Sequence, residues 1–454
     1  MPLTVHKIPG QQPRVWDRAV IFFANLVSLF YGNKEETQEL QKEVGTLETY
    51  GARMIPLLNL IFRQPDNLLV LERQPPEALL HYFQESLQLT IPQIKVIPPD
   101  LYAAMAGKKH ADQARIDESL KAISSHPTEW LDGYVTDDSL VAIAQKVGKK
   151  TVSPPEGSRK GNNKLLLHQF LEDGGAPVFD TYVAANFEEA LEKLNKLKEM
   201  GYHKAVVKSQ IGASGIGMRK IELRKLDSLK NIPDYIFYEG PCLVQGWIDR
   251  SLDGVRDVAS PSVQMFVKEE EISLHDITEQ ILSKDSVHEG NISPPPHLQG
   301  DKATLAQILE QAQTVAVWLH SQGYRGTAST DFHVIERAGS KEVRVCEINA
   351  RVTGATYPSV LASHFQPQRS WLMRNVRFKT PMEDKQILSA LRKQKLLFFP
   401  NREIGVLPFN FNPNDEGLII KGQFLFLGPT LEDTASLLNR VGDMPAIKGE
   451  FDRD

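Results

Sequence analysis

The sequence has few cysteines, no long apolar run and no excess of positive charge, and each shortage argues against a class of protein. Only Cys242 and Cys346 occur, without a CxxC pair, so a disulfide framework or a zinc site is not expected and a reducing compartment fits. The longest apolar run covers residues 19–30, whereas a membrane helix needs roughly 20 residues. The net charge is −5, and nucleic-acid-binding proteins are usually strongly basic. We therefore expect a cytoplasmic protein that binds neither nucleic acid nor membrane.

The first third of the chain alternates predicted strands and helices. The apolar run at 19–30 reads as a buried strand that runs into a loop. Further strands are predicted at 68–71, 94–97 and 133–136, with helices between them at 76–87 and after them at 139–146. This alternation is typical of a small parallel α/β sheet. A proline-rich stretch at 153–157 ends the pattern and predicts a domain boundary.

The rest of the chain predicts a mixture of helices and strands joined by turns. Helices are predicted at 164–172, 187–200 and 305–319, the last with Asp301 as its N-cap. Extended segments are predicted at 178–183 and 205–208, and paired strands at 409–426 around a turn at 414–417. Residues 366–454 carry no chemistry that the sequence reveals.

A glycine-rich loop follows the strand at 205–208. Lys208 ends the strand, and the loop holds Ser214, Gly215 and Gly217. Glycines let the backbone approach a phosphate closely, so that N–H groups donate to its oxygens, and a lysine beside the loop adds positive charge. The spacing matches neither the P-loop nor the dinucleotide-binding fingerprint. Alone, the segment is equally well explained as a hairpin turn with incidental glycines.

Three oxygen-bearing side chains end two strands that we expect to be neighbours. Glu347 and Asn349 are two residues apart and therefore share one face of a strand, while Asp331 belongs to the preceding strand. Hard oxygen ligands of this kind suit Mg²⁺ bridged by phosphates. Arg351 continues the same spacing, and its guanidinium suits a phosphoryl group. The alternative is a solvated strand face on which Glu347 pairs with Arg351. Cys346 should point to the opposite face from Glu347 and pack in the core.

A short apolar strand at 243–248 predicts a third element of a nucleotide site. Gln245, Trp247 and Ile248 stand at its exit, where backbone groups could bind an adenine edge and side chains could pack on the ring. The alternative, an ordinary core strand with one buried tryptophan, is the better explanation of this segment by itself.

Taken in order, these segments resemble the ATP-grasp superfamily, and in particular the peptide ligases of the pheganomycin type, which carry a pre-ATP-grasp domain. The resemblance covers most of the chain. It rests on residues 48–53 and 133–137 in the first part, on 161–164 and the glycine loop in the middle, and on 346–354 near the end. It implies a Rossmann-like pre-ATP-grasp domain (1–157), then a two-lobed ATP-grasp domain (158–365), with α/β and α+β architecture. The small lobe would cover about 178–250, the large lobe about 251–365, and an extension of unknown role 366–454.

The resemblance also implies roles for single residues. Lys164 and Lys208 would hold the ATP phosphates, under the loop around Ser214 and Gly215. Gln245 to Ile248 would be the adenine hinge, although many relatives have Glu-Lys where Gln245-Gly246 stands. A carboxylate after the hinge would bind the ribose: Asp253, or alternatively Asp249 or Asp257. Asp331, Glu347 and Asn349 would hold Mg²⁺, or alternatively Mn²⁺, and Arg351 would stabilise the transition states.

The acceptor side is predicted from two turns. His288 and Gly290 lie in one, and Thr353 and Gly354 follow the metal strand, where backbone N–H groups could meet a substrate carboxylate. Both segments are also ordinary turns, and for His288 that is the better explanation.

The expected reaction joins a carboxylate to an amine through an acyl phosphate, at the cost of ATP. A kinase on the same fold and a non-catalytic nucleotide-binding module are the alternatives. We expect amino acids or peptides as substrates, and the oligomeric state stays open, with a homodimer as one alternative.

Overall fold

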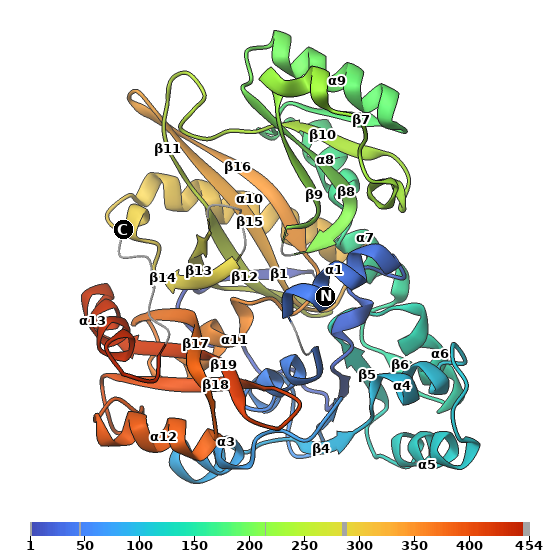
Figure 1. Ribbon diagram of the computed structural model, residues 1–454, viewed down its shortest axis with the longest axis vertical. Helices are drawn as coiled ribbons and strands as arrows, with labels where there is room; N and C mark the ends of the chain where they lie inside the picture. The colour runs from blue at the N-terminus through green and yellow to red at the C-terminus, as the bar shows by residue number, and fades with distance from the viewer. Residues whose placement is uncertain (1, 45–46, 214, 284–287, 448–454) are drawn as a thin grey trace.

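The computed structural model describes residues 2–44, 47–213, 215–283 and 288–447. Within these residues the strands form three sheets, of five, four and ten strands. In Figure 1 the five-stranded sheet, built from the N-terminal part of the chain, lies in the lower part of the view. The four-stranded sheet lies at the top with α9 (Phe187–Glu199). The ten-stranded sheet runs between them and on into the C-terminal part. This mixed α/β architecture agrees with the predicted fold class.

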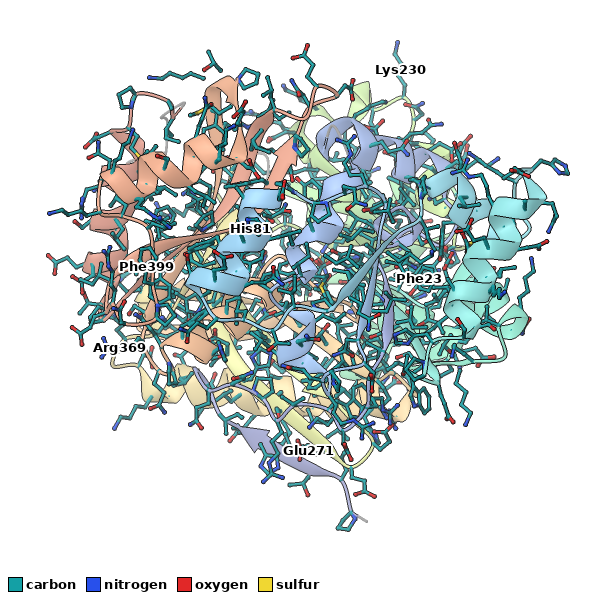
Figure 2. The ribbon with its side chains drawn as sticks, turned by 90° about the horizontal axis from the view of Figure 1, so that it is seen from below. Phe23, His81, Lys230, Glu271, Arg369 and Phe399 are labelled. Atoms are coloured by element: carbon teal, nitrogen blue, oxygen red, sulfur yellow. The ribbon has the colours of Figure 1, made fainter. Side chains whose placement is uncertain are left out.

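The five-stranded sheet is parallel and has the order β4-β3-β2-β5-β6. Its central strand, β2 (Ile21–Phe23), is buried throughout because helices and 3-10 turns cover both faces, as its unbroken apolar sequence predicts. Phe23 lies among interior side chains, whereas Lys230 projects at the periphery (Figure 2). The other strands are β3 (Leu68–Leu71), β4 (Gln93–Val96), β5 (Trp130–Gly133) and β6 (Lys150–Thr151). The order reverses at β2, and the carboxyl end of such a switch strand is where open α/β sheets bind ligands.

Helices and turns of this part follow the predicted pattern, with differences at their ends. Helix α3 (Glu77–His81) continues as a π-helical turn at Tyr82–Ser86, and α6 spans Asp138–Lys146. The run predicted as a strand into a loop becomes β2 followed by a 3-10 turn, η1 (Leu26–Ser28). This part also contains a longer 3-10 segment, η2 (Leu47–Met54). Its other helices are α1 (Lys34–Val44), α2 (Leu58–Ile61), α4 (Pro99–Met105), α5 (Gln113–Ser124) and α7 (Pro155–Gly161).

The four-stranded antiparallel sheet has the order β7-β10-β8-β9. Helix α9 packs on one face through buried Ala190, Leu194 and Leu197, which stand three or four residues apart. The predicted glycine loop is the turn between β8 (Lys204–Ala213) and β9 (Ile216–Glu222), so the strand runs five residues further than expected. The other strands are β7 (Thr181–Ala184) and β10 (Cys242–Gly246).

The ten-stranded sheet follows the path β11-β15-β12-β13-β14-β17-β19-β18, with β1 on β13 and β16 on β15. Helix α10 (Lys302–Ser321) covers one face, and Asp301 caps its first turn by accepting from Thr304 N at 3.1 Å, as predicted. The strands are β1 (Thr4–Lys7), β11 (Val255–Ala259), β12 (Pro261–Val267), β13 (Glu271–Leu282), β14 (His288–Ser293), β15 (Gly326–Arg337), β16 (Ser340–Asn349), β17 (Ser370–Met382), β18 (Gly405–Pro413) and β19 (Ile419–Gly428).

The C-terminal residues extend this sheet. Strand β14 pairs with β17, β17 pairs with β19, and β19 pairs with β18 through the predicted hairpin turn. Helix α12 (Asp384–Lys393) lies against α3, where Asp384 accepts from Ala78 N at 2.8 Å. Figure 2 shows His81 of α3 beside this C-terminal part. Strand pairing therefore joins residues 366–447 to the large lobe, and the three-domain division stays a prediction.

In the described ranges, no helix combines the length and the apolar character that crossing a membrane would require.

Candidate active site

A cavity of about 700 Å³ opens where the three sheets meet. The turn after β2 supplies Leu26 and Leu29, the switch-point position expected of a ligand site. The four-stranded sheet supplies β8, β9 and β10, and the ten-stranded sheet supplies β15 and β16. Most of the predicted site residues line this one cavity: Lys164, Lys208, Gly215, Gly217, Gln245, Trp247, Ile248, His288, Asp331, Glu347, Asn349, Arg351, Thr353 and Gly354.

The predicted metal ligands converge from two paired strands. Asp331 of β15 lies directly opposite Glu347 of β16 in the strand register. Asn349 Nδ2 donates to Asp331 Oδ2 at 3.0 Å, and Ser262 Oγ donates to Oδ1 at 2.6 Å. Burial, and then the charge of Glu347, raise the pKa of Asp331 to about 7. Two carboxylates held this close repel each other, and a bound dication would relieve the repulsion.

The described residues contain no group of three His, Cys, Asp or Glu side chains arranged to hold a metal ion. The candidate site instead offers two carboxylates and one amide, all with oxygen donors. Mg²⁺ is commonly held by one or two carboxylates, with phosphates and water completing its octahedron. The donor set therefore fits Mg²⁺ bound together with a phosphate and does not fit a metal held by protein alone.

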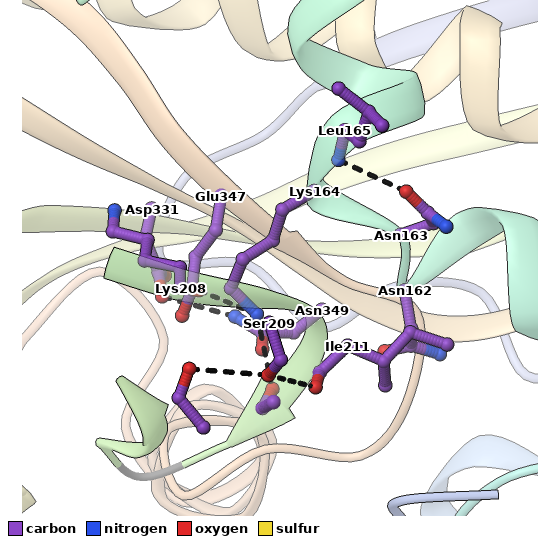
Figure 3. A network of polar contacts seen from close by, with 12 residues as sticks. Asn162, Asn163, Lys164, Leu165, Lys208, Ser209, Ile211, Asp331, Glu347 and Asn349 are labelled. Carbon is purple, nitrogen blue, oxygen red and sulfur yellow. Dashed lines mark hydrogen bonds and ion pairs between the residues drawn. The ribbon is translucent and has the colours of Figure 1, made fainter. Parts of the chain in front are cut away.

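Two lysines place positive charge beside the carboxylates, as Figure 3 shows. Lys164 Nζ lies 3.2 Å from Glu347 Oε2 and donates to the carbonyl of Gly212 at 3.2 Å. Lys208 Nζ donates to Gln245 Oε1 at 2.7 Å. Burial alone would raise the pKa of Glu347, but the charges of Lys164, Lys208 and Arg351 outweigh it and lower that pKa.

The position of Lys164 follows from the start of its helix. Asn163 caps α8 (Lys164–Asp173) by accepting from Leu165 N and Leu166 N at 3.0 Å. The Asn163 Nδ2 group donates to Gln210 Oε1 of β8 at 2.7 Å. The cap therefore fixes the helix start and also ties it to the strand that carries Lys208.

Arg351 is held by the predicted metal ligand Asn349 and by Asn162, to which the sequence analysis gave no role. Its guanidinium donates to Asn349 Oδ1 and to Asn162 Oδ1. Asn162 Oδ1 also accepts from Ala350 N at 3.1 Å, and Asn162 Nδ2 donates to the Ala350 carbonyl at 3.1 Å. Asn162 thus fixes both the backbone and the side chain at the end of β16. Its place beside Lys164 in the sequence gave no signal of this role.

The glycine hairpin lies against α1 of the N-terminal part. Ser209 Oγ donates to Glu36 Oε1 at 2.8 Å. Gly217 has φ +77°, and a Cβ there would lie 2.2 Å from Ser209 Oγ and 2.3 Å from Glu36 Oε1. Only glycine fits this position, for its backbone conformation and for space. Ser214, predicted to contact phosphate, lies outside the described residues.

The predicted hinge residues belong to the same cavity. Gln245, Trp247 and Ile248 line it together with Phe179 and His333, two residues that the sequence analysis did not select. The rings of Phe179 and His333 meet edge to face at 5.3 Å, and burial lowers the pKa of His333 to about 4, so its imidazole is neutral. His333 stands two residues after Asp331, and the same period-two rule would have found it.

The predicted ribose carboxylate is not brought to the cavity. Asp253 is exposed before β11, and its carbonyl accepts from Arg337 at 3.3 Å. Asp257 is exposed and pairs with Arg250 at 2.8 Å. Asp249 comes nearer, since it accepts from the indole Nε1 of Trp247 at 3.1 Å, but it also pairs with Lys204 at 2.9 Å.

The predicted acceptor-side residues are brought together on one wall. His288 Nε2 and Asn291 Oδ1 are 2.6 Å apart, and a Cβ on Gly354 would meet the His288 ring at 2.9 Å. Thr353 lines the cavity, whereas Gly290 packs against the Met373 backbone, where a Cβ would lie 2.1 Å from the carbonyl. Gly290 thus allows β14 and β17 to approach closely, which is a structural role.

Cys346 departs from its expected position. It lines the cavity and is half-buried, whereas strict alternation along β16 predicted a core position. The register shifts here, because Glu347 pairs with Asp331 while Val345 pairs with Phe332. Cys346 is the extra residue of a β-bulge, which re-aims a side chain. Burial raises the pKa of its thiol to about 11, so the thiol is protonated at neutral pH and is a poor nucleophile.

Comparison with solved structures shows that the chain has the ATP-grasp fold preceded by a pre-ATP-grasp domain. An N5-carboxyaminoimidazole synthetase from Staphylococcus aureus is 10% identical with a TM-score of 0.53, over 95% of this chain and 99% of that chain. A biotin carboxylase from Campylobacter jejuni, in complex with a β,γ-ATP ligand, is 13% identical with a TM-score of 0.55, over 95% and 92%. At these identities the likeness shows the fold. The predicted fold class is confirmed.

Among curated proteins, the chain is similar to the butirosin acyl-carrier protein–L-glutamate ligase of Niallia circulans. The two are 23% identical over 301 residues, which are 66% of this chain and 64% of that protein. The alignment thus spans less than two thirds of the relative's length. No family model matches the chain. The comparisons confirm the resemblance to ATP-grasp ligases and support the expected class of enzyme.

Proposed function

We propose that the protein is an ATP- and Mg²⁺-dependent ligase that joins a carboxylate to an amine through an acyl phosphate. The observation that carries the proposal is the convergence of Lys164, Lys208, Asp331, Glu347 and Arg351 on one cavity under a glycine hairpin. These groups are all suited to phosphate and its counter-ion. In the described residues that line the cavity there is no serine–histidine or cysteine–histidine hydrogen bond that would favour a covalent acyl-enzyme.

Substrates are expected at opposite ends of the cavity. ATP would place its adenine among Phe179, Trp247 and Ile248, and its phosphates beside Lys164 and Lys208. The fold relatives support this, since their structures include complexes with ATP and ADP. The carboxylate and the amine, from amino acids or peptides, would bind toward His288 and Gly354. L-Glutamate is the first carboxylate to test, because the curated relative is named for it.

In the first step a carboxylate oxygen forms a bond to the γ-phosphorus of ATP, and the bond from that phosphorus to the bridging oxygen breaks and releases ADP. Bound at Asp331, Glu347 and Asn349, Mg²⁺ would neutralise phosphate charge. Lys164, Lys208 and Arg351 would stabilise the negative charge that the transferring group carries, which is the main requirement of phosphoryl transfer. Asn162 would keep the Arg351 guanidinium aimed at it.

In the second step the nitrogen lone pair of the amine attacks the acyl carbon. The bond from carbon to the phosphate-bearing oxygen breaks, phosphate leaves with that oxygen, and the ammonium proton passes to solvent. Arg351 and the backbone N–H groups near Gly354 would stabilise the tetrahedral oxyanion. The glycine hairpin would exclude water that would otherwise hydrolyse the acyl phosphate.

The test is an isotope experiment with the full-length protein, ATP and Mg²⁺. L-Glutamate labelled with ¹⁸O in its carboxylates is incubated with a panel of amino acids and short peptides, and products are weighed by mass spectrometry. We expect an amide product, ADP, and one ¹⁸O atom in the released phosphate. Glu347→Gln should abolish product, while Glu310→Gln, at an exposed position on α10, should not. An amide formed with unlabelled phosphate would refute the acyl phosphate, and labelled donor phosphorylated without amide would indicate a kinase.

A further inference from the structure

The C-terminal strands contribute a polar wall to the cavity that the proposed reaction leaves unexplained. Asn375 and Arg377 of β17 lie directly opposite Gln423 and Lys421 of β19, and all four side chains line the cavity. Gln423 Nε2 donates to Asn375 Oδ1 at 3.2 Å. Arg377 and Lys421 are therefore like charges at directly paired positions on one sheet face, an arrangement that destabilises a sheet and that a bound anion would relieve.

A buried cation faces the same region. Arg53 of η2 is 8% exposed and lines the cavity, and within the described residues it has no ion-pair partner. Its guanidinium lies 4.3 Å from the ring centroid of Tyr357 and 4.9 Å from that of Tyr50. Lys421 Nζ lies 5.2 Å from the same Tyr50 ring. Arg53 and Lys421 thus flank one tyrosine, and the rings hold Arg53 without neutralising it.

The charge of this wall is strongly unbalanced. Among the described residues that line the cavity, the carboxylates are Glu289, Asp331 and Glu347. The last two belong to the candidate metal site of Asp331, Glu347 and Asn349, which we call the metal end. Glu289 lies 3.2 Å from Arg374. Among the described lining residues, Glu289 is thus paired with Arg374, and no other carboxylate outside the candidate metal site accompanies Arg53, Arg377 and Lys421.

We propose that Arg53, Arg377 and Lys421 form a subsite for a substrate carboxylate other than the one that is phosphorylated. A guanidinium offers paired N–H donors that match a carboxylate, and Asn375 and Gln423 offer further amide donors. Residues 370–428 thus gain a role as the substrate-selecting wall of the cavity. The inference rests on the proposed ligase function and names its substrate class as one that includes a second carboxylate.

The second carboxylate could belong to the donor or to the amine acceptor, and substrate pairs separate the two. For the donor, L-glutamate is compared with L-glutamine and with L-isoglutamine, each of which lacks one carboxylate. For the acceptor, glycine is compared with glycinamide, with L-glutamate as donor. The full-length wild type is expected to prefer the free acid at least about tenfold in kcat/KM in one of the two arms.

Variants of the wall residues then test whether these residues cause the preference for the free acid. Arg377→Gln and Lys421→Gln change side chains that are exposed and half-buried, so folding should be preserved. Each should lower the acid-to-amide ratio of kcat/KM about fivefold, mainly through KM. Arg53→Gln should lower it further. Lys379→Gln is the matched control, since Lys379 is an exposed cation two residues along β17 that does not line the cavity, and it should keep the wild-type ratio.

Two outcomes would overturn the subsite while the ligase function stands. In the first, amide forms but the acid-to-amide ratio of kcat/KM is near one in both arms. In the second, the ratio is unchanged in Arg377→Gln, Lys421→Gln and Arg53→Gln. Absence of any amide product would instead count against the proposed function. Calorimetric titration with two sets of ligands, L-glutamate with its two mono-amides and glycine with glycinamide, then decides the subsite. Tighter binding of the free acid in one set, lost in Arg53→Gln, supports it, and equal binding in both sets overturns it.

Discussion

Replacing Glu36 by glutamine should make the protein more stable at neutral pH, and the effect should vanish in acid. Glu36 is 1% exposed in α1, and burial raises the pKa of its carboxyl from 4.5 to about 7, although the hydrogen bond from Ser209 acts to lower it. That bond compensates only in part, because the one Ser209 hydroxyl proton faces three acceptors. They are Ile211 O at 2.7 Å, Glu36 Oε1 at 2.8 Å and Gly217 O at 3.1 Å.

The magnitude follows from proton linkage. Between pH 4.5 and about 7 the folded protein keeps the Glu36 proton that the unfolded chain has lost, so the free energy of unfolding falls as pH rises through this window. The full difference corresponds to about 3 kcal/mol, at about 1.4 kcal/mol for each tenfold change in the protonation equilibrium. A glutamine has the same shape and no proton to lose, so the variant should not show this fall.

Thermal unfolding measured from pH 5 to pH 8 tests the expectation. With about 2.1 cal/mol/K of unfolding entropy per residue, a chain of 454 residues converts about 3 kcal/mol into about 3 °C. The Tm of Glu36→Gln minus that of the wild type should therefore rise by up to about 3 °C between pH 5 and pH 8. Glu35→Gln is the control, because Glu35 is the exposed neighbour in α1. A difference that stays flat with pH, or one that Glu35→Gln reproduces, would refute the reasoning.

Three further outcomes are expected at the cavity. Glu347→Gln should lower kcat at least about 100-fold with an unchanged Tm, because the metal end loses a charge; near-normal turnover at limiting Mg²⁺ would remove Glu347 from the site. Lys208→Met should weaken ATP binding about tenfold in calorimetry, because a buried ammonium beside the glycine hairpin is lost; an unchanged Kd would contradict that placement. Cys346→Ala should keep at least about half of the activity, because its thiol is protonated at neutral pH; lost activity in a folded variant would point to a covalent role.

The parts of the site that could be predicted from sequence are those set by local periodicity. Asp331, Glu347 and Asn349 share a face because strand side chains alternate, and Lys208 precedes a glycine turn because the turn needs residues without a Cβ. The strands at 68–71 and 409–426 follow from their apolar runs and turn residues in the same way. The prediction held where neighbouring residues in the chain decide the geometry.

Contacts between segments that are far apart in the sequence could not be predicted from local periodicity. Asn162 holds Arg351 across 189 positions of sequence, and Arg53 reaches the cavity from η2, which packs against β18. No local pattern encodes such pairs, since each partner is compatible with many folds. The prediction of a ribose-binding carboxylate met a related difficulty. Asp253 was chosen because it follows the hinge closely in sequence, but it is exposed and does not line the cavity.

Cys346 shows how one extra residue in a strand changes the side-chain directions that strict alternation predicts. Strict alternation from Glu347 predicts that Cys346 and Val345 point to opposite faces, with Cys346 in the core. The bulge leaves Cys346 without a partner between the pairs Glu347–Asp331 and Val345–Phe332, so the chain turns it toward the cavity. A bulge costs ladder hydrogen bonds and is favoured where it re-aims a side chain beside a site. Its effect here is to keep Glu347 opposite Asp331 while Val345 stays in the core, which a regular strand of this length would not do. The bulge therefore adjoins the candidate metal site, where it turns Cys346 toward the cavity between two pairs that keep their partners.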